Sequence, residues 1–166
     1  LDSKLLSSLT SFVREDLPVS ACVKDKSAGI ICCDRKYFPD TFGVVVRAIQ
    51  RSIEEAFGGG RKCVVLPNFR ILDYSKPKTG LPPHVDLCRV DPFEAVPTRT
   101  THTVILYLDD FDGGGETVLM EKVNGEGDEN DLTIVSIERG KTLLFPHNCA
   151  HRANPQSKLR SNSQTL

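Results

Sequence analysis

The sequence of 166 residues has no apolar run approaching the roughly 20 residues needed to span a bilayer, and no signal-peptide pattern at its start. It also has no excess of positive charge, because 21 Lys and Arg stand against 22 Asp and Glu. The net charge of −1 argues against a polyanionic partner for the chain as a whole, although a local basic patch can still exist. We therefore expect neither a membrane partner nor a nucleic-acid partner.

The six cysteines include no C-x-x-C pair, so the sequence lacks the mark of zinc ribbons and thioredoxin-like proteins. An even count permits disulfides. However, a chain of this length with 39% hydrophobic residues can bury a sizeable core without them. We expect one domain with reduced thiols and a cytoplasmic or nuclear location.

The first 60 residues read mainly as helices. Apolar residues recur at helical spacing in two places: Leu5, Leu6, Leu9, Phe12 and Val13, and then Phe42, Val45, Val46, Ile49, Ile53 and Phe57. Asp40 is the expected N-cap of the second helix, and three glycines from Gly58 end it. A short β-rich stretch that includes Gly29 to Cys33 lies between them.

After residue 60 the period changes from helical to extended, with turn residues between short apolar segments. The expected strands are Lys62–Ser75, His84–Cys88, Thr101–Leu108, Glu116–Glu121, Leu132–Ile137, Thr142–Pro146 and a short last one near Lys158–Arg160. Helices followed by many short strands predict a mainly β domain with flanking helices, a barrel or double-sheet jelly roll. Residues 1–60 would support a barrel core formed by residues 61–166.

The string His84-Val85-Asp86 is the main candidate for chemistry. Side chains two residues apart on a strand point to the same face, so one imidazole and one carboxylate can converge. With a distant histidine they would form the 2-His-1-carboxylate set that holds non-haem Fe(II) and leaves coordination positions open. Alone the tripeptide is a weak signal, because an exposed His near a turn Asp arises often by chance.

Further motifs surround this string. In order along the chain they are Tyr74, Gly80, His84–Asp86, Thr101–Asp109, Gly114–Thr117, Gly140–His147 and His151. Together they resemble the Fe(II)- and 2-oxoglutarate-dependent oxygenases, and the prolyl 4-hydroxylase-like branch most closely. That pattern runs Tyr, H-x-D, a strand ending in Y-L-N or Y-L-D, G-G-E-T, G-x-x-L-x-F and a second histidine. The resemblance covers residues 70–160.

This resemblance implies a distorted double-stranded β-helix, a cupin-like barrel with Fe(II) inside its open end. By motif position the ligands would be His84, Asp86 and His151. His147 is the alternative third ligand. His151 is preferred because the family's ligand follows a few residues after the G-x-x-L-x-F strand, whereas His147 next to Pro146 fits a turn.

The resemblance also implies a 2-oxoglutarate pocket. Thr103 and Tyr107 share one strand face, which the family turns inward, and Tyr107 would lie near the distal carboxylate of 2-oxoglutarate. Tyr74 stands where the family has a pocket tyrosine. His102 has the opposite parity and is expected on the outer face.

A cation for the distal carboxylate should follow the last ligand. Arg160 lies nine residues after His151, the spacing of the family's Arg-bearing members, and Lys158 lies seven after it. We expect Arg160 to bind 2-oxoglutarate, with Lys158 as the alternative. Arg152, directly after the ligand, is a third cation in this part of the chain.

The implied reaction is hydroxylation of a C–H bond with Fe(II), 2-oxoglutarate and O₂, releasing succinate and CO₂, with ascorbate as a supporting reductant. A protein or peptide side chain such as proline is the expected substrate. The stretch Leu87–Thr100, with Arg89 and Arg99, would lie beside the iron entrance. Two alternatives remain: a non-catalytic metal-binding sensor or scaffold barrel, and an oxygenase acting on nucleic-acid bases or small molecules.

Overall fold

The computed structural model describes residues 1–24, 31–60, 62–74, 79–90, 99–124 and 130–157. Within these residues the chain is mainly β, and every strand pair is antiparallel. The elements are α1 (Ser3–Glu15), β1 (Ala21–Lys24), β2 (Ile31–Pro39), α2 (Val44–Ala56), β3 (Asn68–Asp73), β4 (Leu81–His84), β5 (His102–Leu106), β6 (Thr117–Met120), β7 (Asp131–Val135), β8 (Thr142–Pro146) and β9 (Ala150–Ala153). The expected β-rich fold with flanking helices is confirmed.

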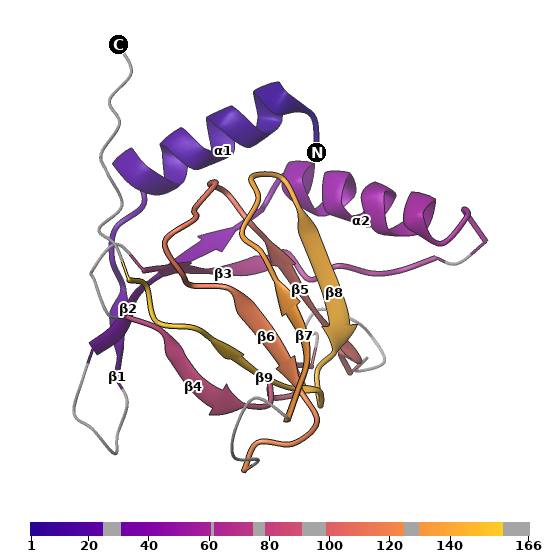
Figure 1. Ribbon diagram of the computed structural model, residues 1–166. Coiled ribbons are helices and arrows are strands. Elements are labelled where there is room, and N and C mark those ends of the chain that lie inside the picture. The colour runs from indigo at the N-terminus through magenta and orange to yellow at the C-terminus, as the bar shows by residue number, and fades with distance from the viewer. Residues whose placement is uncertain (25–30, 61, 75–78, 91–98, 125–129, 158–166) are drawn as a thin grey trace.

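The strands form three groups, ordered β1-β2-β3, β4-β9-β6-β7 and β5-β8. Along the chain, β4 enters the four-stranded sheet, β5 the two-stranded pair, β6 and β7 the four-stranded sheet again, β8 the pair and β9 the larger sheet. Both helices lie along one side of these strands (Figure 1). In the described part of the chain, helices therefore cover only this side of the strands.

The two helices cover the sheets through one apolar cluster. The buried members of this cluster are Leu9, Val13, Val45, Ile49 and Ile53. Partly buried side chains of β2, β3, β5 and β8 pack against this cluster, among them Phe38, Phe69 and Leu144.

Both helices have 13 residues, and no helix in the described part of the chain could span a membrane.

The start of α2 differs from the sequence-based expectation. The helix begins at Val44, and its N-cap is Gly43, whose φ of 64° suits a residue without a Cβ. Asp40 still caps the helix from outside, because its carboxylate accepts hydrogen bonds from the backbone N–H groups of Val44 and Val46 at 3.1 and 2.8 Å. Phe42, expected on the apolar face, is 84% exposed, because it precedes the helix rather than lying on it.

Several strands also differ from the predicted bounds. The strands predicted for β5 to β8 agree within two residues at each end. The strand predicted from Lys62 begins only at Asn68, because Pro67 precedes it and the Cys63 N–H bonds to the Glu54 carboxylate instead of a neighbouring strand. β2 is longer than the β-rich stretch expected there and continues to Pro39.

Two differences affect the candidate site. The strand predicted over His84–Cys88 is wrong: β4 ends at His84, and the Asp86 N–H bonds to the carbonyl of His147 in the loop after β8 at 3.0 Å. β9, which carries His151, was not predicted. The last strand expected near Lys158–Arg160 lies outside the described residues.

The helical cluster should dominate stability. Ile49 is 1% exposed at its centre, so Ile49→Ala should lower the free energy of unfolding by about 2–5 kcal/mol through lost burial and the cavity left behind. Phe42→Ala, at an exposed position, should change it by less than about 0.5 kcal/mol. Urea unfolding followed by circular dichroism measures both. A similar loss in the two variants would contradict this account of the core.

Candidate metal centre

Two histidines face each other across neighbouring strands. His84, the last residue of β4, is the direct antiparallel partner of His151 on β9. Directly opposed side chains on paired strands lie close together, and here the ring centroids are 4.2 Å apart. His151 is buried and packs edge-on against the ring of Phe145, with a centroid distance of 4.8 Å. The strand register therefore brings together two imidazoles that are 67 residues apart, from position 84 to position 151.

Asp86 completes this group from the segment after β4. One carboxylate oxygen, Oδ2, lies 3.6 Å from Nε2 of His151. The same oxygen accepts a hydrogen bond of 2.6 Å from the hydroxyl of Thr103 on β5. The backbone N–H of Asp86 is held by the carbonyl of His147. Asp86 is thus fixed by β5 and by the loop after β8, not by the strand geometry that its spacing from His84 suggested.

The imidazole nitrogens have distinct roles. Nδ1 of His84 lies 2.8 Å from the carbonyl of Pro82, and Nδ1 of His151 lies 3.0 Å from that of Cys149. A carbonyl oxygen only accepts, so each Nδ1 carries the proton and each Nε2 keeps its lone pair in the neutral ring. Backbone carbonyls on the far nitrogen are the usual means of orienting a metal-bound histidine.

Burial also favours the neutral form of His151. Loss of solvent lowers the pKa of His151 below its ordinary value, and the nearby His84 acts in the same direction. The hydrogen bond to Cys149 and the Asp86 carboxylate oppose this shift in part. A neutral imidazole at pH 7 is the form that binds a metal ion.

These three residues form a group of donor atoms suited to a metal ion. The ligand atoms of His84, Asp86 and His151 all lie within 4.8 Å of one another. Two imidazole nitrogens and one carboxylate oxygen are the donors of the 2-His-1-carboxylate set. His147 does not belong to this group, and its Nδ1 is buried without a hydrogen-bond partner among the described residues. His102 is exposed, as expected, with Nδ1 2.9 Å from the Thr101 hydroxyl.

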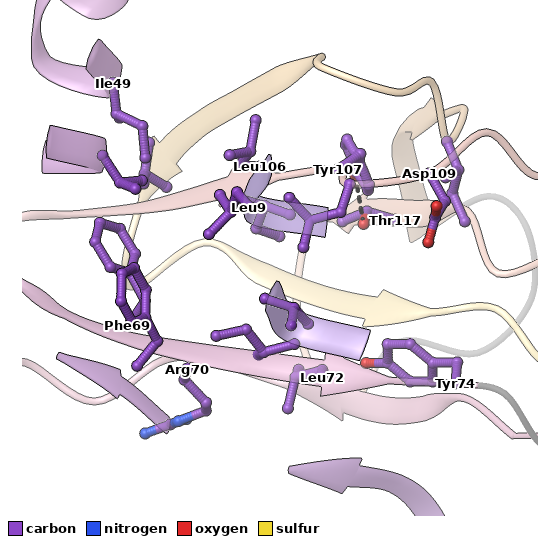
Figure 2. Close-up of a pocket in the computed structure, with 18 of the residues that line it drawn as sticks. Leu9, Ile49, Phe69, Arg70, Leu72, Tyr74, Leu106, Tyr107, Asp109 and Thr117 are labelled. Carbon is purple, nitrogen blue, oxygen red and sulfur yellow. Dashed lines mark hydrogen bonds between the residues drawn. The ribbon is translucent and has the colours of Figure 1, made fainter. Parts of the chain in front are cut away.

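A cavity of about 260 Å³ lies between β3 and β5, beneath the helices (Figure 2). One end is apolar and is lined by side chains such as Ile49 and Phe69. The other end holds the polar groups of Tyr74, Tyr107, Asp109 and Thr117. The candidate metal ligands do not line this cavity. The candidate metal group and the cavity are therefore separate features.

β9 connects the two features. Ala153 lines the cavity and follows His151 by two residues, so both side chains face the same way, with α-carbons about 7 Å apart. On the adjacent strand β6, Thr117 is the partner of Ala153, and Leu119 is the partner of His151. The polar end of the cavity thus lies one strand repeat from the metal group.

Tyr107 and Thr117 are hydrogen-bonded to each other at the polar end of the cavity. The buried Tyr107 hydroxyl donates to the Thr117 hydroxyl at 2.7 Å, which Figure 2 shows as a dashed line. Burial raises the pKa of Tyr107, and the Thr117 contact opposes this only in part, so the phenol stays protonated and can donate. Thr117 was not assigned a role from the sequence, although it ends the Gly114–Thr117 motif.

Of the other residues expected to bind 2-oxoglutarate, only Tyr74 lines the cavity among those that the structure describes. Tyr74 lines the cavity just after β3 (Figure 2). Thr103 donates to Asp86, so in the structure its hydroxyl holds a candidate metal ligand. Arg160 and Lys158 lie outside the described residues. Arg152 is engaged elsewhere, because its guanidinium holds Asp131 through two hydrogen bonds of 2.6 and 2.7 Å.

Comparison with known proteins adds no further assignment. No protein-family model matches the chain, and no curated protein matches it. The candidate function therefore rests on the residues and their geometry.

The contact between Thr103 and Asp86 can be tested directly. Thr103→Val keeps the shape but removes the donor that orients the carboxylate, so affinity for Mn(II), used as a stand-in for Fe(II), should fall about tenfold or more. Thr133→Val, at an exposed position on β7 where the hydroxyl bonds its neighbour's carbonyl, is the matched control. Isothermal titration calorimetry measures both. Unchanged affinity in Thr103→Val would show that this hydrogen bond does not orient the ligand.

Proposed function

We propose that this chain is an Fe(II)- and 2-oxoglutarate-dependent oxygenase in which His84, Asp86 and His151 hold the metal. The observation that carries the proposal is the donor group itself. Both imidazoles have Nδ1 fixed by a backbone carbonyl, and the carboxylate is oriented by Thr103. Metal ligands need hydrogen bonds that orient them while their metal-binding atoms stay available. Residues that lie together by chance would not be expected to have such hydrogen bonds on all three side chains.

The strand arrangement supports a double-stranded β-helix as the fold. The chain from β4 to β9 passes repeatedly between the four-stranded sheet and the β5-β8 pair, with antiparallel pairing throughout. This is the winding expected of a jelly roll. In such a barrel His84 and His151 would stand on adjacent strands of one sheet, with Asp86 and Thr103 reaching them from the chain that crosses to the other sheet.

Bound Fe(II) would supply O₂ activation, with 2-oxoglutarate as the electron donor, so that one oxygen atom enters a substrate C–H bond and the other enters succinate as CO₂ leaves. The protein's own residues bind and orient. His84, Asp86 and His151 would hold the ion with three protein ligands, which is the set that leaves coordination positions open for cosubstrate and O₂. The Thr103 hydroxyl keeps the Asp86 carboxylate turned toward the two imidazoles.

The cavity supports a site for 2-oxoglutarate. Its polar end, with Tyr107 and Thr117, lies one strand repeat from His151, so a short dicarboxylate held by the metal could extend toward it. The protonated Tyr107 hydroxyl would turn its hydrogen from Thr117 to the distal carboxylate, and Tyr74 would close the other side. A buried carboxylate also needs a cation, and Arg160, with Lys158 as the alternative, stays the proposal for that role.

A metal-binding barrel without turnover is the second candidate. The only cation among the described lining residues of the cavity is Arg70, and Figure 2 shows it on the opposite side of β3 from Phe69. If no cation completes the pocket, metal binding would occur without 2-oxoglutarate chemistry. The prolyl or other protein side chain proposed as substrate would then not be oxidised.

Turnover separates these functions. The wild-type chain with Fe(II), ascorbate and 2-oxoglutarate should form succinate, which proton NMR detects, even without added substrate at a slow uncoupled rate. Asp86→Ala should reduce the rate at least about a hundredfold, because it removes a metal ligand. His102→Ala, at an exposed histidine outside the group, should leave it unchanged.

Three results are informative. Succinate formation that needs Asp86 supports the oxygenase. Metal binding that needs Asp86 without succinate formation indicates the non-catalytic barrel. Equal succinate formation in wild type and Asp86→Ala would overturn the assignment of the metal site.

A further inference from the structure

Three arginines from three parts of the chain act with their charge on the hydroxyl of Tyr37. Arg35 and Tyr37 lie two residues apart on β2 and share one face of the sheet. Arg70 on β3 is the direct strand partner of Tyr37, so it lies on the same face. Arg89, from the segment after the metal group, also acts on the Tyr37 hydroxyl with its charge. We call Arg35, Tyr37, Arg70 and Arg89 the arginine surface.

The positive charge on this surface is not neutralised by the described part of the chain. Arg35 Nη1 lies 3.4 Å from the Tyr37 hydroxyl, and Arg35 Nε is buried without a hydrogen-bond partner there. None of the three guanidinium groups forms a salt bridge with a described carboxylate. Guanidinium groups that lie close together repel one another. Because the described residues offer them no carboxylate partner, an anion between them would relieve this repulsion.

The Tyr37 hydroxyl reports the same field. The hydrogen bond from Arg35 is the main cause that lowers the pKa of Tyr37. Burial opposes it, and the charges of Arg35, Arg70 and Arg89 each lower the pKa by a smaller amount. The phenol is exposed and can donate a hydrogen bond to an anion held by the arginines. A carboxylate would thus meet planar guanidinium forks and one hydroxyl donor.

This surface lies close to the candidate metal group. Arg89 follows the ligand Asp86 by three residues, so their α-carbons are at most about 11 Å apart. Apolar side chains between and beside them are exposed: Val85, Leu87 and Val90. The backbone of Arg89 is fixed by two hydrogen bonds to Thr100. The Arg89 N–H donates to the Thr100 hydroxyl at 2.8 Å, and the Thr100 N–H donates to the Arg89 carbonyl at 2.9 Å.

We propose that the arginine surface binds an acidic side chain of a peptide substrate, with the apolar side chains beside Asp86 contacting the neighbouring peptide residues. This names the substrate class of the metal site and rests on the proposed function. In an extended peptide, the acidic residue would stand about three to five residues from the one presented to the metal. A peptide fits better than a nucleic acid, because the cationic patch is compact, its rim is apolar and the net charge is −1.

Peptide binding to the full chain tests the proposal with the metal site left out of the measurement. The probe is a fluorescein-labelled decapeptide of alternating Glu and Gly, compared with its Gln–Gly counterpart by fluorescence anisotropy in the presence of a chelator. The double variant R70Q/R89Q removes two exposed guanidinium groups. R51Q, an equal change of charge per site at an exposed position on α2, is the control.

The Glu peptide should bind the wild type about tenfold more tightly than the Gln peptide, and R70Q/R89Q should remove most of this preference. R51Q should change binding of the Glu peptide less than about twofold. Added salt should weaken binding of the Glu peptide to the wild type. Equal binding of the Glu peptide by wild type and R70Q/R89Q, or no preference for Glu, would overturn the proposal. Tighter binding of a single-stranded RNA oligonucleotide than of the Glu peptide would overturn the assigned partner class. The binding assay contains a chelator and no metal. A preference for the Glu peptide would therefore stand even if the chain forms no succinate.

Discussion

The pairing of β4 with β9 sets the geometry on which the candidate site depends. It places His84 directly opposite His151, and the hydrogen bonds of the neighbouring backbone fix each ring through Nδ1. A shift of one residue in this register would turn one of the two imidazoles to the opposite face of the sheet. The adjacent pairing of β9 with β6 extends the same constraint to Thr117 and hence to the polar end of the cavity.

Asp86 shows how the rest of the fold supports this pairing. Its backbone is held by the loop after β8 and its carboxylate by Thr103 on β5, so both strands of the two-stranded pair help to fix one candidate ligand. β5 and β8 are in turn packed against the helices through Val104, Leu106 and Leu144. The helical cluster therefore stabilises the strand pair that orients the carboxylate, although no helical residue belongs to the metal group.

The sequence predicted that His84, Asp86 and His151 come together, but it did not predict the contacts that bring them together. His84, Asp86 and His151 were found from motif order, because ligand residues are few and their spacing is restrictive. β9 was missed, because four residues with two alanines carry little strand propensity and the strand is defined by partners far away in sequence. The contact of Thr103 with Asp86 was also missed, since strand parity shows which face a side chain takes but not what meets it there. The arginine surface depends on the β2–β3 register, which no local pattern reveals.

The position of a bound metal ion tests the central claim most directly. Crystals of the full chain grown with Fe(II) without oxygen can be measured at the iron absorption edge, where anomalous scattering locates iron alone. The account predicts one peak bonded to Nε2 of His84, a carboxylate oxygen of Asp86 and Nε2 of His151, at about 2.0–2.2 Å from each. A peak bonded to His147 in place of His151, or no peak at this group in crystals that hold iron elsewhere, would contradict it.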